Sequence, residues 1–236
     1  MSTPFFYIAE YRSSDKIIQL DEDTSRHVVS VLRMTIGEQI LLTDGKGSML
    51  TAEITDGHRK RCLVTVIEEK FKKKEARKIT IAISLLKNAN RFEWFIEKAT
   101  EIGISEIIPL ICERTEKQKF RFERMQGICI SAMLQSQQVW LPVLQEPVSF
   151  KKAVEESTHQ QKFIAHCMDD AKRNLADMVN ESLVSKIILI GPEGDFTTDE
   201  INLALQNHFS AVTLGQTRLR TETAGIVAAA LLKTTV

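Results

Sequence analysis

The chain has 236 residues, of which 43% are hydrophobic and 26% are charged, a composition that favours a globular protein of two modest domains. Its formal net charge is zero, which excludes a globally basic nucleic-acid-binding protein, so any affinity for RNA must come from local clusters of charge. No signal pattern, membrane-length apolar run or metal-site cysteine spacing is visible, which predicts a cytoplasmic protein with reduced thiols, no metal and no membrane partner.

The first part of the chain predicts a small β-barrel. Short apolar segments suited to strands occur at residues 5–8, 17–20, 39–43, 49–54 and 62–67. Residues 43–48 have the chemistry of a hairpin turn, and the strands on either side of it alternate apolar with polar positions. One helix is expected from about Thr24 to Met34, because Val28, Val31 and Leu32 have helical spacing.

A basic segment follows the expected barrel. Residues 58–78 hold nine lysines and arginines against three acidic residues. A run of this kind is most often a solvated face. Because residues 70–78 lie where the strand-rich part ends, we interpret them as an interdomain linker that could also follow RNA phosphates.

From residue 79 onward, apolar strands alternate with helical patterns. Strands are expected at residues 79–86, 107–111, 163–166, 187–190 and 211–214, with the third of these beside the fourth. A helix is expected at residues 90–103, capped by Asn90 and ended by Gly103. Further helices are expected at residues 122 to about 138 and at residues 224–232. Another should begin at a capping box formed by Thr197 and Glu200. This alternation predicts an α/β sheet with helices on both faces.

Two loops that follow buried strands predict a ligand site. The first is Gly191-Pro192-Glu193-Gly194, which taken alone is equally well explained as a tight turn. The second carries Arg218, Arg220 and Glu222 directly before an apolar helix, where charges usually have partners or a ligand. Ligands of open α/β sheets bind at the carboxyl ends of strands, so we expect the two loops to line one site. His166, at the end of another strand, either lines this site or is structural.

Several common nucleotide and nucleophile motifs are absent from the sequence. It has no phosphate-binding loop of the Walker type, no Gly-x-Gly-x-x-Gly after a strand and no Gly-x-Ser-x-Gly. Nucleoside triphosphates, dinucleotides and a serine nucleophile are therefore disfavoured. A cofactor without phosphate is consistent with this pattern.

The two loops together resemble the 16S ribosomal RNA N3-methyluridine methyltransferases of the trefoil-knotted SPOUT superfamily. The resemblance rests on Gly191-Pro192-Glu193-Gly194 and on residues 214–224, and it continues through Arg26-His27, residues 31–34 and residues 98–103. It implies a PUA-like RNA-binding β-barrel at residues 1–72 and an α/β methyltransferase domain with a deep trefoil knot at residues 73–236. It further implies S-adenosylmethionine as cofactor, the RNA of the small ribosomal subunit as partner, and a homodimer.

The resemblance also implies which residues bind the cofactor and the RNA. One cofactor wall would be Gly191, Pro192, Glu193 and Gly194, and the other Leu214, Gly215, Leu219, Arg220, Thr223 and Ala224. The candidate RNA contacts are Arg26 and Arg33 in the barrel, and Lys87 and Arg91 after the strand at residues 79–86.

Methylation of uracil N3 requires removal of the proton on that nitrogen. Arg220 stays protonated, so we expect it to stabilise negative charge on the uracil oxygens rather than to act as a base. Glu193 or Glu222 could accept the proton, or either could instead pair with Arg218 or Arg220 to hold the loop. The sequence leaves these alternatives open.

The chain departs from the family pattern in three places. Thr3-Pro4 stands where an arginine is common, Leu134-Gln135-Ser136-Gln137-Gln138 replaces a Glu-Gln-Ser/Cys-x-Arg motif, and Asp195 replaces the second glycine of the first loop. The first two bear on RNA contacts, whereas aspartate tolerates the left-handed backbone that a glycine can adopt. The rival interpretations are a ribose 2′-O-methyltransferase of the same superfamily and a non-catalytic RNA-binding or ribosome-assembly protein.

Overall fold

A computed structural model describes residues 3–116, 119–168 and 172–234 of the chain. The described residues divide into two compact units. One unit comprises residues up to 74 together with residues 133–141, and the other comprises residues 75–132 and the chain from residue 142 onward. No helix within these described ranges is long and apolar enough to cross a membrane.

The first unit is a five-stranded sheet that encloses one core. Its strands are β1 (Phe5–Tyr7), β2 (Ile17–Gln19), β3 (Gln39–Thr43), β4 (Ser48–Asp56) and β5 (Leu63–Phe71), in the order β1-β3-β4-β5-β2. Two register shifts between β4 and β5 bend these strands. Phe6 of β1 and Ile18 of β2 pack into the same cluster as Leu50 of β4, although β1 and β2 are at opposite ends of the order. This shared core confirms the expected barrel.

The expected helix at residues 24–34 is wrong in its start and in its type. Helix α1 (Glu22–Arg26) begins earlier because the carboxylate of Asp21 accepts the backbone N–H of Thr24. A π-helical segment, η1 (His27–Val31), follows it. The chain then turns at Arg33, whose φ of 58° is unusual for a residue with a side chain.

Residues 133–141 return from the larger α/β region to the barrel unit. Helix α3 (Phe122–Gln135) ends at Gln135, earlier than the expected position near residue 138. The indole Nε1 of Trp140 donates to the carbonyl of Lys72 at 2.8 Å, and its ring lies against Gly47, where a Cβ would be 2.5 Å away. The expected boundary at residue 72 assigns residues 133–141 to the methyltransferase domain, whereas the structure groups them with the barrel unit. Strand β5 also extends to Phe71, so the expected linker begins only after that residue.

The second unit contains an eight-stranded parallel sheet. Its strands are β6 (Lys78–Ser84), β7 (Glu106–Ile111), β8 (Val143–Leu144), β9 (Val148–Ser149), β10 (Gln161–Ala165), β11 (Arg173–Asn174), β12 (Ser185–Ile190) and β13 (Ser210–Thr213). The order is β11-β13-β10-β12-β6-β7-β8, and β9 pairs with β7. The central strands β6 and β12 are buried almost throughout, as expected for a sheet covered on both faces. The pairing of β10 with β12 confirms the expected neighbours.

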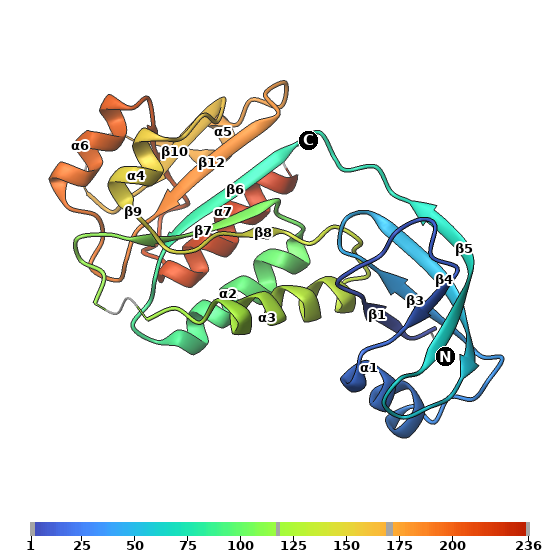
Figure 1. The fold of residues 1–236 in the computed structure, drawn as a ribbon. Coiled ribbons are helices and arrows are strands. Elements are labelled where there is room, and N and C mark those ends of the chain that lie inside the picture. The colour runs from blue at the N-terminus through green and yellow to red at the C-terminus, as the bar shows by residue number, and fades with distance from the viewer. Residues whose placement is uncertain (1–2, 117–118, 169–171, 235–236) are drawn as a thin grey trace. The chain divides into compact units, whose positions relative to one another are not determined.

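Helices cover both faces of this sheet, as the sequence predicts (Figure 1). Helices α2 (Ala89–Ile102) and α7 (Thr221–Thr234) pack together on one face, and α4 (Phe150–Glu155) and α6 (Thr198–Gln206) lie on the other. A short helix, α5 (Leu175–Met178), follows β11. The side chain that caps α2 is that of Asn88, not Asn90, while Gly103 ends the helix with a φ of 84°, as expected. The trefoil knot stays a prediction, because sheet order and helix packing do not define threading.

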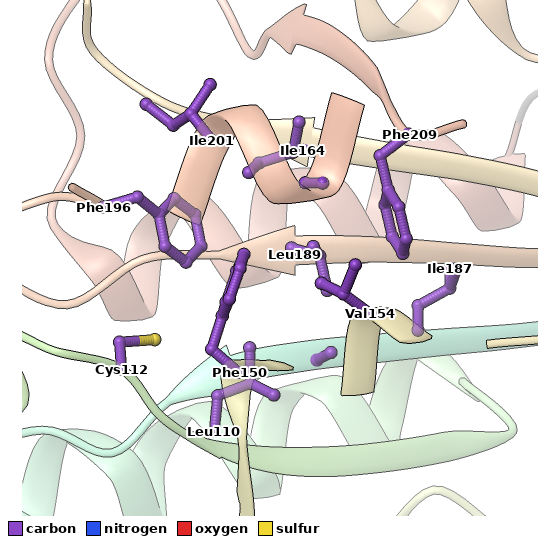
Figure 2. Close-up of a cluster of buried hydrophobic side chains, with 12 residues drawn as sticks. Leu110, Cys112, Phe150, Val154, Ile164, Ile187, Leu189, Phe196, Ile201 and Phe209 are labelled. Atoms are coloured by element: carbon purple, nitrogen blue, oxygen red, sulfur yellow. The ribbon is translucent and has the colours of Figure 1, made fainter. Parts of the chain in front are cut away.

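The core under α4 and α6 fixes the position of the first motif loop. Figure 2 shows the ring of Phe196 beside that of Phe150, to the left of the side chain of Leu189 from β12. The two ring centroids are 5.1 Å apart, and both side chains are buried. Because Phe196 directly follows the loop that begins at Gly191, its burial anchors that loop to the sheet.

Candidate active site

Three adjacent strands end at the site. At the end of β10, Ala165 pairs with Ile190 of β12 on one side and with Val212 of β13 on the other. The loops after β12 and β13 are the two motif loops. The two loops therefore leave the sheet on either side of Ala165. They do so at the carboxyl ends of the strands, where ligands of such sheets bind.

Two neighbouring cavities lie at the motif loops, the first between the two loops and the second between the second loop and the segment that follows β10. The first has a volume of about 330 Å³ and the second about 400 Å³. They adjoin, since both are lined by Ala165, Cys167, Arg218, Leu219 and Ala224. Together they give a concave space with a mixed apolar and charged lining, as is typical of a small-molecule site.

Most of the expected cofactor residues line these cavities. Those in the first are Gly191, Pro192, Glu193 and Arg220, those in the second are Leu214 and Gly215, and those in both are Leu219 and Ala224. Gly194 and Thr223 are not part of either lining. Gly194 instead accepts a hydrogen bond through its carbonyl, and Thr223 belongs to the first turn of α7.

Two residues outside the motifs, Arg114 and Cys167, form hydrogen bonds with the first loop. Arg114, in the segment after β7, donates from Nη1 to the carbonyl of Gly194 at 2.7 Å. Asp195 has a φ of 64° and accepts the backbone N–H of Cys167 at 2.8 Å. Both partners follow strands that end at this edge, β7 and β10. In the sequence, only their position after a strand could have identified Arg114 and Cys167 as contacts of this loop.

Helix α6 begins directly after the first loop with the expected capping box. The side chain of Thr197 accepts from the backbone of Glu200, and the carboxylate of Glu200 accepts from the backbone of Thr197. The second oxygen of Glu200 accepts the N–H of Glu113 at 2.9 Å. These bonds tie the start of α6 to the segment after β7, which stiffens the wall of the site.

Of the two alternatives that the sequence leaves open for the glutamates, pairing with Arg218 or Arg220 is wrong for Glu222. Its carboxylate is buried, with Oε1 lying 3.6 Å from Nε of Arg91 in the first turn of α2. Its Oε2 has no hydrogen-bond partner within the part of the chain that is described. Arg218 and Arg220 are exposed and form no ion pair with a described carboxylate. Glu193 is exposed on the cavity wall.

The candidate RNA contacts fall into two groups. Lys87 precedes the N-cap of α2 and pairs with Glu116 at 2.7 Å, and Arg91 in the first turn of α2 pairs with Glu222. The hydrogen bond and the charge of Glu116 raise the pKa of Lys87, which stays protonated. In the barrel unit, Arg26 pairs with Asp23 at 2.6 Å and Arg33 is exposed.

The remaining nucleophilic and basic groups have structural surroundings. Burial raises the pKa of Cys112 to about 12 and that of Cys129 to about 11, which keeps both thiols protonated. His166 is buried and lines the second cavity, and its carbonyl accepts from Nζ of Lys172 at 2.8 Å. The described residues contain no group of His, Cys, Asp and Glu side chains suited to a metal ion.

Comparison with known proteins matches both units. A family model described as an RNA methyltransferase domain matches residues 73–233, and one described as an RNA methyltransferase PUA domain matches residues 20–67. Ribosomal RNA small subunit methyltransferase E of Synechocystis sp. is 32% identical over 206 residues, which cover 85% of this chain and 67% of that protein.

Two solved structures share the fold over almost the whole chain. A probable rRNA-methyltransferase from Porphyromonas gingivalis has a TM-score of 0.89 and 37% identity, covering 96% of this chain and 95% of that one. A ribosomal RNA small subunit methyltransferase E from Neisseria gonorrhoeae, solved bound to S-adenosylmethionine, has a TM-score of 0.88 and 31% identity, covering 99% and 98%.

The parallel sheet, the paired loops and the barrel define an RNA methyltransferase with an N-terminal PUA-like domain. Within this class, the chain belongs to the ribosomal RNA small subunit methyltransferase E family.

Proposed function

We propose that this protein transfers the methyl group of S-adenosylmethionine to N3 of a uridine in small-subunit ribosomal RNA. The observation that carries the proposal is the cavity that the two motif loops line beside Ala165, with a second cavity adjoining it. Family membership supports the cofactor and the RNA substrate, and the related protein of Neisseria gonorrhoeae was solved with this cofactor bound.

The residues around the cavity fit S-adenosylmethionine. Leu214, Leu219 and Ala224 offer apolar surface for the adenine ring, and Gly191 and Gly215 allow close approach of the backbone. The cofactor carries no phosphate, which agrees with the absence of a phosphate loop from the sequence. When bound, it supplies a methyl group activated by a positively charged sulfonium.

The protein must stabilise the uracil anion and accept its proton. Arg220 lines the first cavity, is exposed and has no carboxylate partner among the described residues, so its charge is available to the uracil oxygens. Glu193 lines the same cavity, whereas Glu222 is buried beside Arg91 and is not part of the lining. We therefore assign proton acceptance to Glu193, and we assign to Glu222 the positioning of Arg91.

The RNA is proposed to extend beyond the cavity. Lys87 and Arg91 would contact phosphates near α2, and Arg26 and Arg33 would contact RNA through a PUA-like domain at residues 1–72. The methyltransferase domain at residues 73–236, a homodimeric state and a cytoplasmic location belong to the same proposal. Light scattering of the purified protein tests the homodimer.

The test is a methylation reaction with purified protein, labelled S-adenosylmethionine and small-subunit RNA or particles, read by nucleoside mass spectrometry. N3-methyluridine is the expected product. A ribose-methylated nucleoside would instead support a 2′-O-methyltransferase. Calorimetry that detects no binding of S-adenosylmethionine, even at high concentration, would support a non-catalytic RNA-binding protein.

A further inference from the structure

We propose that Asp195 makes the cofactor cavity discriminate by charge, so that it binds cationic S-adenosylmethionine more tightly than the neutral product S-adenosylhomocysteine. This inference rests on the proposed function. It concerns Asp195, the residue that follows the Gly-Pro-Glu-Gly loop. Two features of Asp195 carry the inference, its fixed carboxylate and its place in the cavity wall.

The backbone at Asp195 favours glycine, yet an aspartate is present. Its φ of 64° is left-handed, a conformation that costs a residue with a side chain more than it costs glycine. The carboxylate is held by one backbone donor on each oxygen, with Cys167 N at 2.8 Å from Oδ2 and Phe196 N at 2.9 Å from Oδ1. Two such bonds hold the side chain in place.

The residue that carries this fixed carboxylate lines the first cavity. Asp195 and Cys167 both line it, and Asp195 is only partly exposed, so water screens its charge less than that of a surface residue. Glu193, the other acidic residue in this lining, is exposed and lies close enough to Lys87 to raise the pKa of that amine. Asp195 is thus the better placed of the two to act on a ligand in the cavity.

Methyl transfer changes the charge of the ligand. The sulfur–carbon bond of the sulfonium breaks as the bond from carbon to uracil N3 forms. The sulfur keeps the electron pair and becomes a neutral thioether, and the N3 proton leaves to a base. A fixed negative charge attracts the sulfonium cation before transfer. After transfer the sulfur is neutral, so this attraction is lost. Asp195 therefore favours binding of the cofactor over its product.

The experiment is calorimetry on the full chain, which measures Kd for S-adenosylmethionine and for S-adenosylhomocysteine separately. Asp195→Asn keeps the size of the side chain and tolerates left-handed backbone, and Asp195→Gly relaxes the backbone and removes both acceptors. Both remove the charge. We expect the preference, the Kd of the product divided by the Kd of the cofactor, to fall by about threefold to tenfold in both variants. Asp199→Asn, which neutralises an exposed carboxylate of α6 outside both cavities, should leave it unchanged.

A loss of structure alone would weaken both ligands by the same factor and would not move this ratio. The inference is overturned if both Asp195 variants keep the wild-type preference, whatever their absolute affinities. It is also overturned if Asp199→Asn lowers the preference as much as they do. Failure of the proposed function looks different, because the wild-type protein would then bind neither ligand.

Discussion

The buried carboxylate of Glu222 lies 3.6 Å from the guanidinium of Arg91, which joins the first turn of α7 to the first turn of α2. The side chain of Glu222 is 9% exposed and that of Arg91 is 39% exposed. A carboxylate removed from water depends on a partner of opposite charge. The pair therefore fixes Arg91 at the edge of the site and compensates the charge of Glu222.

Removal of Arg91 should destabilise the protein more than simultaneous neutralisation of both residues. We expect Arg91→Ala to lower the free energy of unfolding by about 1–3 kcal/mol, because it leaves a buried carboxylate unpaired. The double variant Arg91→Ala with Glu222→Gln should recover part of this loss. Urea denaturation of the two single variants and the double variant measures the coupling. Strictly additive effects would show that the two side chains do not interact.

Gly225 allows α7 to pack closely on α2 and the sheet. A Cβ at this position would lie 2.6 Å from the ring of Phe95 and 2.9 Å from Ile83, both of which are buried. We expect Gly225→Ala to destabilise the protein by about 1–3 kcal/mol. Gly127→Ala is the matched control, since Gly127 is an exposed residue of α3 with no atom within 4 Å of its added Cβ. It should stabilise the helix by about 0.5–1 kcal/mol. Thermal denaturation measures both, and equal effects would contradict the packing account.

At the amino ends of β6 and β7, a chain of hydrogen bonds favours the neutral form of His159. Thr80 donates from its hydroxyl to Glu106 at 2.9 Å, and its oxygen is 2.9 Å from Nε2 of His159. Nδ1 of His159 is 3.1 Å from the hydroxyl of Ser157. With Thr80 donating to Glu106, Nε2 carries the proton and Nδ1 accepts from Ser157. The neutral ring is thus fully bonded.

These surroundings predict a loss of stability at acid pH. Burial, followed by the charges of Lys78 and Lys162, lowers the pKa of His159 below its ordinary value of 6.5. The charge of Glu106 opposes this shift but does not reverse it. The unfolded chain therefore binds more protons than the folded one as pH falls through that value, so the free energy of unfolding decreases. Burial raises the pKa of Glu106, but hydrogen bonds from Lys78, Gln145 and Thr80 outweigh it and lower the pKa below 4.5. Its contribution is lost only in more acid solution.

His159→Gln separates the two contributions. Urea denaturation from about pH 7.5 to about pH 4 should show a shallower loss of stability below about pH 6.5 in the variant than in the wild type. The steeper decrease below about pH 4.5 should remain. An identical slope in both proteins near pH 6 would show that His159 does not cause the effect.

Arg220 is the residue with the clearest catalytic assignment. We expect Arg220→Ala to bind S-adenosylmethionine with nearly wild-type affinity and to lose methyl transfer by about 100-fold or more, as when a charge that stabilises a developing oxyanion is removed. Calorimetry measures the binding, and single-turnover methylation measures the transfer. Arg121→Ala, which removes an exposed arginine outside both cavities, is the control. Near wild-type turnover in Arg220→Ala would remove the assignment.

The sequence predicts the sheet well because its strands are continuous apolar runs, as in β12, and the Thr197–Glu200 box is a local signal. It does not predict partners that depend on tertiary packing. Glu222 pairs with Arg91, more than a hundred residues away, rather than with the nearby arginines. The return of Trp140 to Lys72 is invisible for the same reason. Arg114 carries no motif, and only the fold brings it to Gly194.

The most direct test of the function is the N3-methyluridine content of small-subunit ribosomal RNA from a strain that lacks this gene. Nucleoside mass spectrometry should show the loss of one N3-methyluridine, its return when the wild-type gene is restored, and no return with the Arg220→Ala variant. An unchanged N3-methyluridine content in the strain without the gene would contradict the proposed function.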